Sequence, residues 1–375
     1  MIAKASPNRQ RGNRILSNVT KHPPMPLIRW AETQPGVRAR WANPLAPGRL
    51  AIGMVLALVG INVVSRACSG LHVGFDLVAN VSYFLAVPML GISVVAACTR
   101  RWLAAVAALV GAFVAATPLL SPAARRAANP APEATASVLH CNIRGSSAAW
   151  DALRAIMDAR KPDMVAVVEV SDGVIERILA DERLLQEYPH RVLPRLGLEW
   201  TQVVLSRHPM KPLPSPEIKP GTRMQSLFSS HRSNIVSLPI GDVIFSTEHV
   251  PSPRNSASWT MGNDQIVALG HLVRDHYSAY ELPVLVTGDF NSSPSGYRDG
   301  LMRRATGLRP DPESFFPPGT WPSVLPTFLR LPLDRAWASE ELAFAPPVVL
   351  GDVGSDHRPI YFRFAVLPKP APPGD

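Results

Sequence analysis

A short apolar run that ends in polar residues is the clearest chemical signal in this chain. Residues 284–286 are aliphatic and precede Gly-Asp-Phe-Asn at residues 288–291, so a buried strand is expected to end near Thr287. Asp289 and Asn291 are two residues apart, so a carboxylate and an amide oxygen can converge on one ligand. A turn in which both side chains bond their own backbone explains this motif equally well when it is taken alone. The other strand ends therefore decide between a site and a turn.

Polar residues also end the other apolar runs of this part of the chain. Glu169 interrupts the apolar residues 164–170, where a carboxylate is costly unless a metal ion or an arginine meets it. The full set of candidate site residues is Asn142, Glu169, His249, Asp289, Asn291, Asp334, Asp356 and His357. Each has a structural explanation by itself, as a turn, a cap or a hydrogen-bonded strand end. Their recurrence at strand ends indicates one shared site.

Six motifs, in this order, resemble the endonuclease/exonuclease/phosphatase superfamily with its DNase I-like fold. They are Asn-Ile-Arg-Gly at 142–145, Val-Val-Glu-Val at 167–170, Glu-His-Val-Pro-Ser-Pro at 248–253, Gly-Asp-Phe-Asn-Ser-Ser-Pro at 288–294, Leu-Asp at 333–334 and Gly-Ser-Asp-His-Arg-Pro at 354–359. The resemblance implies an α/β fold, a four-layer sandwich of two mostly antiparallel sheets packed face to face and flanked by helices. It also implies a hydrolase of phosphate esters that uses Mg²⁺ or Mn²⁺.

The resemblance implies a metal role for three of these residues. Glu169 matches the main metal carboxylate, with Asn142 and Asp356 beside it. Oxygen ligands of this kind suit a hard divalent cation that keeps several waters and leaves room for a phosphate oxygen.

The remaining five residues match catalytic positions of the family. Asp289 and Asn291 match the pair that orients the attacking water and holds a phosphate oxygen. His357, paired with Asp334, matches the histidine that contacts the phosphate oxygens or acts as base, and an adjacent carboxylate would raise its pKa. His249 matches the candidate general acid for the leaving oxygen. The proton of the water can go to Asp289 or to His357, and the sequence leaves both open.

Two positions depart from the family pattern. Arg335 follows Asp334, where the family usually has His or Tyr, and no arginine occurs at residues 262–264, where the long helix often carries one. Neither position supplies a metal ligand. Activity is therefore expected to survive, and the departures bear on substrate contacts. The cationic residues near the motifs are few: Arg144, Arg254, Arg335 and Arg358.

Three apolar segments precede this region, at residues 50–64, 77–98 and 102–120. The second and third are long enough to cross a bilayer as helices, which takes about 20 residues, whereas the first is short. A buried core helix explains one such run but not two adjacent ones, and a cleaved signal peptide would not begin so far into the chain. We therefore predict two to three transmembrane helices in residues 50–120.

Basic residues predict the orientation of these helices. Residues 1–49 contain nine Lys or Arg and one acidic residue, and Arg100 and Arg101 fill the link between the second and third segments. By the positive-inside rule both belong in the cytoplasm, so with three spans the chain after residue 120 lies on the outer face of an inner or plasma membrane. Arg125 and Arg126 mildly oppose this orientation.

The net charge of +9 does not indicate a nucleic-acid partner. Residues 1–49 carry +8 and residues 50–134 carry +3, which leaves −2 for residues 135–375. The positive charge is better explained by membrane topology. Cys141 is the one cysteine after residue 100, so no internal disulfide is available in the region that carries the motifs.

The chain is therefore expected to contain five parts. These are a basic cytoplasmic tail at 1–49, the transmembrane helices at 50–120, an Ala/Pro linker at 121–136, the catalytic domain at 137–366 and a Pro-rich tail at 367–375. Within the catalytic domain we expect strands at 138–142, 164–170, 202–205, 234–238 and 243–247, and helices at 148–160, 171–186 and 258–277.

The function predicted from these observations is a membrane-anchored, metal-dependent phosphoesterase that uses in-line attack of water. Its partners are the bilayer and a phosphate-ester substrate, which is nucleic acid, a lipid headgroup or an inositol phosphate, and no obligate protein partner is inferred. An endonuclease or exonuclease acting on DNA or RNA is the first alternative. The near-neutral charge of residues 135–375 disfavours it, because a protein that binds a polyanion needs many contacts to phosphates. A catalytically inactive binding or signalling module is the alternative of another class.

Overall fold

The computed structural model describes residues 47–120, 125–126, 135–194, 201–213, 232–311 and 318–368. The chain divides into two compact units, Met1–Ala51 and Ile52–Asp375, and the second contains every candidate site residue. Most of the predicted cytoplasmic tail and of the linker, and most of the C-terminal tail, lie outside the described residues.

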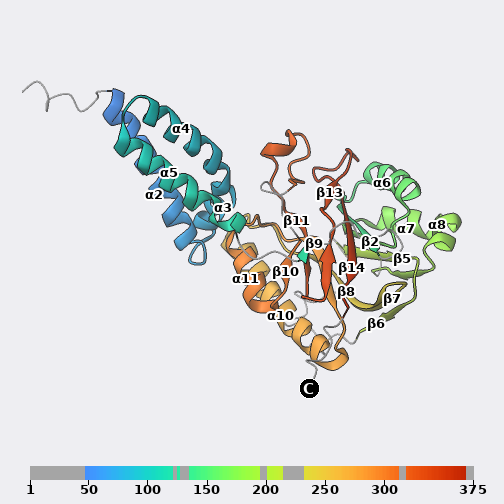
Figure 1. The fold of residues 1–375 in the computed structure, drawn as a ribbon. Coiled ribbons are helices and arrows are strands. Elements are labelled where there is room, and N and C mark those ends of the chain that lie inside the picture. The colour runs from blue at the N-terminus through green and yellow to red at the C-terminus, as the bar shows by residue number, and fades with distance from the viewer. Residues whose placement is uncertain are drawn as a thin grey trace, which may run out of the picture. The chain divides into compact units, whose positions relative to one another are not determined.

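Fourteen strands form two mixed sheets in the described residues (Figure 1). They are β1 (Arg125–Arg126), β2 (Ala136–Asn142), β3 (Met164–Val170), β4 (His190–Val192), β5 (Thr201–Ser206), β6 (Met210–Pro212), β7 (Arg232–Leu238), β8 (Gly241–His249), β9 (Val284–Asp289), β10 (Arg309–Pro310), β11 (Asp334–Ala338), β12 (Leu342–Phe344), β13 (Val348–Val349) and β14 (Ile360–Val366). The first sheet has the order β1-β12-β14-β2-β3-β5-β4, with β13 beside β14, and the second has the order β10-β11-β9-β8-β7-β6. The pairs β1/β12, β2/β3 and β8/β9 are parallel and the others are antiparallel.

The two sheets pack face to face through apolar side chains. Residues that meet between them are buried, and they include Val138, Phe245, Leu285, Phe344 and Phe362. Helices α6 (Ser147–Arg160), α7 (Asp172–Ala180) and α8 (Glu182–Glu187) cover the outer face of the first sheet, and α10 (Ser256–Tyr280) and α11 (Tyr297–Thr306) cover that of the second. The predicted four-layer sandwich is confirmed.

Two local predictions need correction. The helix expected at 171–186 is two helices, because Asp181 leaves helical geometry and its side chain accepts a hydrogen bond from Leu184 N to cap α8. Part of the expected linker belongs to the first sheet, since Arg125–Arg126 pairs with Ala343 and Phe344 of β12.

Apolar helices occupy the region before the sandwich. They are α2 (Pro47–Ala67), α3 (Val73–Ser82), α4 (Ala86–Cys98) and α5 (Trp102–Ala116), with the short 3-10 turn Tyr83–Leu85 between α3 and α4. By length and composition, the continuous segment Val73–Cys98 is the one in the described residues that can cross a membrane, and Ile52–Ala67 and Trp102–Ala116 are shorter. Many of their large apolar side chains are exposed, among them Leu56, Val64, Leu90, Val95, Leu103 and Phe113.

The side chain of Arg335 points away from the candidate residues, although its backbone lies at the same strand end. Because Asp334 and Arg335 are adjacent in β11, their side chains point to opposite faces of the sheet. Arg335 is buried against α11, where its Nη1 lies 3.0 Å from Asp299 Oδ1 and its Nε lies 3.4 Å from Asp311 Oδ1. The expectation that Arg335 is available for substrate contacts is therefore wrong, since its guanidinium holds two buried carboxylates.

Replacing Arg335 should destabilise the fold. In an Arg335→Met variant, Asp311 stays buried without its cation and Asp299 keeps only Arg303, and removal of one partner from a buried ion pair costs about 3–5 kcal/mol. Urea denaturation of the full chain in detergent measures the loss. Adding Asp299→Asn and Asp311→Asn should recover part of the stability, and an Arg335→Met variant as stable as the wild type would contradict the structural role.

Candidate active site

The pairing of the strands brings the predicted residues to one edge of the sandwich. In the second sheet, Asp289 at the end of β9 pairs with His249 on the parallel strand β8 and with Asp334 on the antiparallel strand β11. In the first sheet, Asn142 ends β2 beside the parallel strand β3, which carries Glu169. Strand register therefore places five of the eight residues next to one another, although they come from distant parts of the chain.

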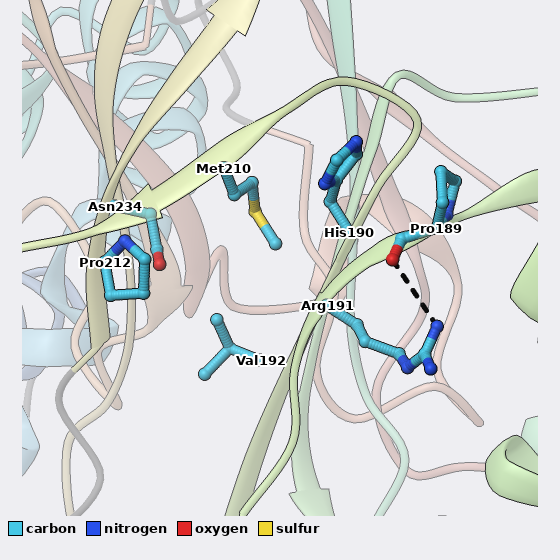
Figure 2. Close-up of a pocket in the computed structure, with 7 residues that line it drawn as sticks. All are labelled: Pro189, His190, Arg191, Val192, Met210, Pro212 and Asn234. Carbon is cyan, nitrogen blue, oxygen red and sulfur yellow. Dashed lines mark hydrogen bonds between the residues drawn. The ribbon is translucent and has the colours of Figure 1, made fainter.

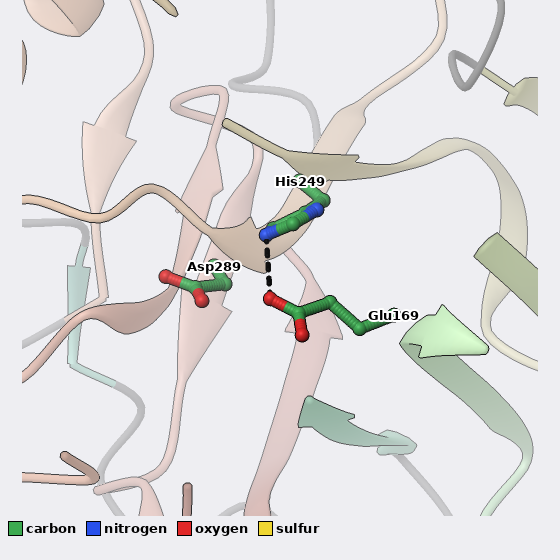
Figure 3. Close-up of side chains that lie close together, drawn as sticks. All are labelled: Glu169, His249 and Asp289. Atoms are coloured by element: carbon green, nitrogen blue, oxygen red, sulfur yellow. Dashed lines mark ion pairs between the residues drawn. The ribbon is translucent and has the colours of Figure 1, made fainter. Parts of the chain in front are cut away.

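Glu169, His249 and Asp289 form the first close group (Figure 3). His249 Nε2 lies 3.1 Å from Glu169 Oε1, and one ligand atom from each of the three residues lies within 4.8 Å of the others. Asn142 joins them, because its Nδ2 donates to Glu169 Oε1 at 2.9 Å and to Asp289 Oδ2 at 3.0 Å. The two sheets are thus connected by side-chain hydrogen bonds at the site.

Charge compensation in this group shifts two pKa values in opposite directions. Burial alone would raise the pKa of Glu169, but the hydrogen bond and charge of His249 lower it overall. Burial alone would lower the pKa of His249, but Glu169 and Asp289 raise it. The geometry therefore favours a carboxylate at Glu169 and an imidazolium at His249.

Asp289, Asp334 and His357 form the second close group. His357 Nδ1 lies 2.7 Å from Asp334 Oδ2, and its Nε2 lies 3.6 Å from Asp289 Oδ2. Burial by itself disfavours the imidazolium, but Asp334 and Asp289 outweigh it and raise the pKa of His357 to about 10. In return, His357 lowers the pKa of Asp334 far below its usual range, although burial opposes this.

The structure adds His140, which sequence reasoning missed. Its Nε2 lies 3.2 Å from Asp334 Oδ1, and the ring is fully buried. Asp334 thereby contacts two histidines, one through each carboxylate oxygen. The signal was available, since His140 lies two residues before Asn142 and so shares its face of β2.

Three residues around the site have left-handed backbone geometry. Arg144, Glu169 and Asn291 have φ values of 48°, 53° and 49°, which are unfavourable for residues with a side chain. Glu169 lies where β3 breaks register between Val167 and Val170. Such conformations cost about 1–3 kcal/mol each and gather at functional sites. The surrounding fold therefore holds these three residues in backbone conformations that are locally unfavourable.

Asn291 and Asp356 belong to neither of these two close groups. Asn291 Nδ2 donates to Val250 O at 2.9 Å, and its backbone N donates to Asp289 Oδ1. Asp356 is partly exposed and lies 3.6 Å from the Arg144 guanidinium. Within the described residues, neither group of metal-ligating atoms includes Asp356.

The donor set fits a divalent cation. Glu169 and Asp289 bring carboxylate oxygens within 4.8 Å of each other, which suits a hard cation, while His249 is paired with Glu169. Asn142 turns its Nδ2 toward both carboxylates and accepts the Arg144 N–H with Oδ1 at 3.0 Å, so its amide must turn before its oxygen can serve as a ligand.

Arg298 of α11 packs against the start of α10. Arg298 is buried, and its Nη1 donates to Pro251 O at 2.8 Å and to Phe290 O at 3.4 Å. A Cβ added at Gly262 would lie 2.4 Å from Arg298 Nη2, so the glycine makes room for this guanidinium. Burial lowers the pKa of Arg298 to about 10. Arg298 therefore ties the loops after β8 and β9 to α10 from within the fold.

The hollow shown in Figure 2 lies elsewhere. It is lined by Pro189, His190, Arg191, Val192, Met210, Pro212 and Asn234, from β4, β6, β7 and the approach to β4. None of the candidate site residues lines it, so it has no part in the chemistry considered below.

Comparison with known families identifies the class of protein. Residues 139–357 match the model of the Endonuclease/Exonuclease/phosphatase family, and the chain belongs to that family. Members are generally metal-dependent hydrolases of phosphate esters. A search of curated protein sequences finds no match.

Solved structures resemble the chain at low sequence identity. Humanized TDP2 from D. rerio is 18% identical, with a TM-score of 0.45, and the match covers 62% of this chain and 100% of that one. The human Nocturnin catalytic domain is 14% identical, with a TM-score of 0.45, over 62% and 94%. Beta toxin from Staphylococcus aureus is 13% identical, with a TM-score of 0.45, over 60% and 99%.

The Asp334–His357 pair yields a pH prediction. Because Asp334 holds the pKa of His357 above its ordinary value, an Asp334→Asn variant should lose the imidazolium at lower pH, by about 1–3 pH units for a removed neighbouring charge. NMR titration of the histidine ring protons in a chelating buffer measures the midpoint. Asp163→Asn, which removes the partner of the remote His208, is the control and should leave His357 unchanged. An unaltered midpoint in Asp334→Asn would show that this pair does not control the histidine.

Proposed function

We propose that the chain hydrolyses a phosphate ester by in-line attack of water. The observation that carries this proposal is the convergence of Glu169, Asp289 and Asp334 with His249 and His357 at one edge of the two sheets. This set combines ligands for a cation, a base, an acid and a positive contact for phosphate.

Glu169 would hold a Mg²⁺ or Mn²⁺ ion, with Asp356 and Asn142 completing the ligands after local rearrangement. When bound, the ion supplies positive charge to the phosphate oxygens. Asp289 and His249 each place one side-chain atom within 4.8 Å of Glu169, so both would lie close to a bound ion.

The protonation states assign the proton transfers. His357 is held as an imidazolium by Asp334, so it stabilises negative charge on the phosphate rather than taking a proton. Burial raises the pKa of Asp289, although His357 opposes the shift, and a carboxylate with a raised pKa is a better base for the attacking water. The imidazolium of His249 can return a proton to the leaving oxygen. Asn291 contributes its amide to the placement of the phosphate.

The anchor is proposed to be the helical region of residues 50–120. Val73–Cys98 is long and apolar enough to span a bilayer, and the large apolar side chains exposed on α2 to α5 need a nonpolar environment. Asp76 near the start of α3 accepts hydrogen bonds from the catalytic domain, whereas Arg100 and Arg101 follow the other end of α4. The catalytic domain therefore belongs on the side opposite the two arginines, which the positive-inside rule makes the outer side.

Metal dependence is tested by changing Glu169. A Glu169→Gln variant keeps the side-chain shape but loses the charge, so hydrolysis of an aryl phosphodiester should fall to the level seen with EDTA, and Mn²⁺ should no longer raise the melting temperature. Glu176→Gln on the exposed face of α7 is the matched control and should keep both properties. Full activity of Glu169→Gln, or EDTA-resistant activity of the wild type, would contradict the proposal.

Topology is tested with reporter fusions in a bacterial host. Alkaline phosphatase joined after Pro368 should be active, because the enzyme works only outside the cytoplasm, and β-galactosidase at the same point should be inactive. The reverse pattern would place the catalytic domain in the cytoplasm.

A further inference from the structure

Helix α3 is hydrogen-bonded to the catalytic domain beside the loop between β9 and α11. This loop, residues 290–296, is called the active-site loop. Asp76 is fully buried, and its two oxygens accept hydrogen bonds from Tyr297 N at 2.7 Å and from Trp259 Nε1 at 2.8 Å. The N-cap of α11 is Gly296, which has no side chain to bond the first turn, so Asp76 supplies a carboxylate to that helix end from another helix. The Asp76 carboxylate, which would be costly inside a membrane without partners, is thus hydrogen-bonded through both oxygens.

Asn80 makes the second half of this contact. Its Oδ1 accepts from Ser293 N at 2.6 Å, and its backbone O accepts from Ser293 Oγ at 2.6 Å. A Cβ added at Gly296 would lie 2.5 Å from Asn80 Oδ1, so the close approach depends on the glycine. Asp76, Asn80, Trp259, Ser293 and Tyr297 together are called the α3 junction.

The α3 junction leads directly into the active site. Ser293 is two residues beyond Asn291, and Arg298, the residue after Tyr297, donates to Phe290 O. Asp76 and Asn80 lie within the first eight residues of the candidate span Val73–Cys98, which places them near one surface of a bilayer. The junction therefore holds the active-site loop near that surface instead of leaving the domain on a free tether.

An apolar loop borders the same site. Val324, Leu325, Phe328 and Leu329 are exposed by 86%, 36%, 70% and 45%. The other large apolar side chains exposed on the described part of the sandwich, from residue 135 onward, are scattered singly: Leu179, Val267, Tyr277 and Val348. Residues 324–329 are called the rim loop.

The base of the rim loop is tied to the candidate site residues. Ser323 N donates to Asp356 O at 2.8 Å, and Arg358 N donates to Thr320 O at 3.0 Å. Thr320 Oγ1 also accepts from Asp334 N at 3.4 Å. An exposed apolar loop is therefore held beside the reacting groups, where it is unfavourable in water and favourable among acyl chains.

We propose that the substrate is a phospholipid of the membrane that anchors the chain. The rim loop inserts its apolar side chains among acyl chains, and the α3 junction holds the site level with the headgroup phosphate. Water attacks phosphorus and gives its proton to Asp289, the P–O bond to one alcohol breaks, and that alcohol leaves with the proton of His249, so the products are an alcohol and a phosphomonoester. This inference rests on the proposed function, and it adds the substrate class. A water-soluble ester would use neither the rim loop nor the junction.

The test compares two kinds of substrate with the full chain in lipid nanodiscs. One is a water-soluble aryl phosphodiester, and the other is a panel of phosphatidylcholine, phosphatidylethanolamine, phosphatidylglycerol and sphingomyelin in vesicles or in the disc itself. Hydrolysis of at least one phospholipid, faster than that of the aryl ester at equal phosphate concentration, is expected. Aryl hydrolysis without cleavage of any phospholipid would overturn the inference and leave the proposed function standing, whereas loss of both activities would contradict the proposed function.

Variants of the rim loop make the test specific. Val324→Ser combined with Phe328→Ser should lower the ratio of phospholipid to aryl hydrolysis about tenfold or more, mainly through a higher KM for lipid, because apolar burial in the bilayer is lost. Leu179→Ser and Val267→Ser remove exposed apolar side chains elsewhere and should leave the ratio unchanged. Asp76→Ala with Asn80→Ala should also lower the ratio. An unchanged ratio in the rim-loop variant would overturn the inference.

Discussion

The site depends on the burial of Asp334 between two histidines. A carboxylate fully removed from water is unstable without compensation, and His140 and His357 supply it through one oxygen each. This contact also connects β2, β11 and the segment before β14, which come from both sheets. The contact between Asp334 Oδ2 and His357 Nδ1 also raises the pKa of His357 and fixes the orientation of its ring.

A chain of polar contacts extends from this pair to helix α3. His357 faces Asp289, Asn142 bridges Asp289 and Glu169, and Glu169 holds His249. On the other side, Arg298 ties Pro251 and Phe290 together and neighbours the α3 junction. The candidate catalytic residues and helix α3 are therefore linked through one connected set of polar contacts.

Sequence periodicity and residue type determined much of this description. Apolar runs with polar ends located β3, β8 and β9 and the candidate residues at their ends. A strand buried on both faces is apolar throughout, and it tolerates a charge only where a partner compensates it. The ordered motifs identified the family and hence the four-layer sandwich. The long uncharged segments identified the apolar helices, since composition alone decides which residues avoid water.

Contacts between distant segments were decided by the tertiary structure. Arg298 of α11 bonds Pro251 O and Phe290 O, and Arg335 binds Asp299 and Asp311 instead of facing the site. Asp76, an isolated acid in an apolar run, turned out to cap α11 across more than two hundred residues of chain. Local patterns specify which face of an element is apolar. They do not specify which distant polar atom will pair with a given polar side chain. That partner depends on how whole helices and sheets pack, and packing is set by shape and burial summed over the entire fold.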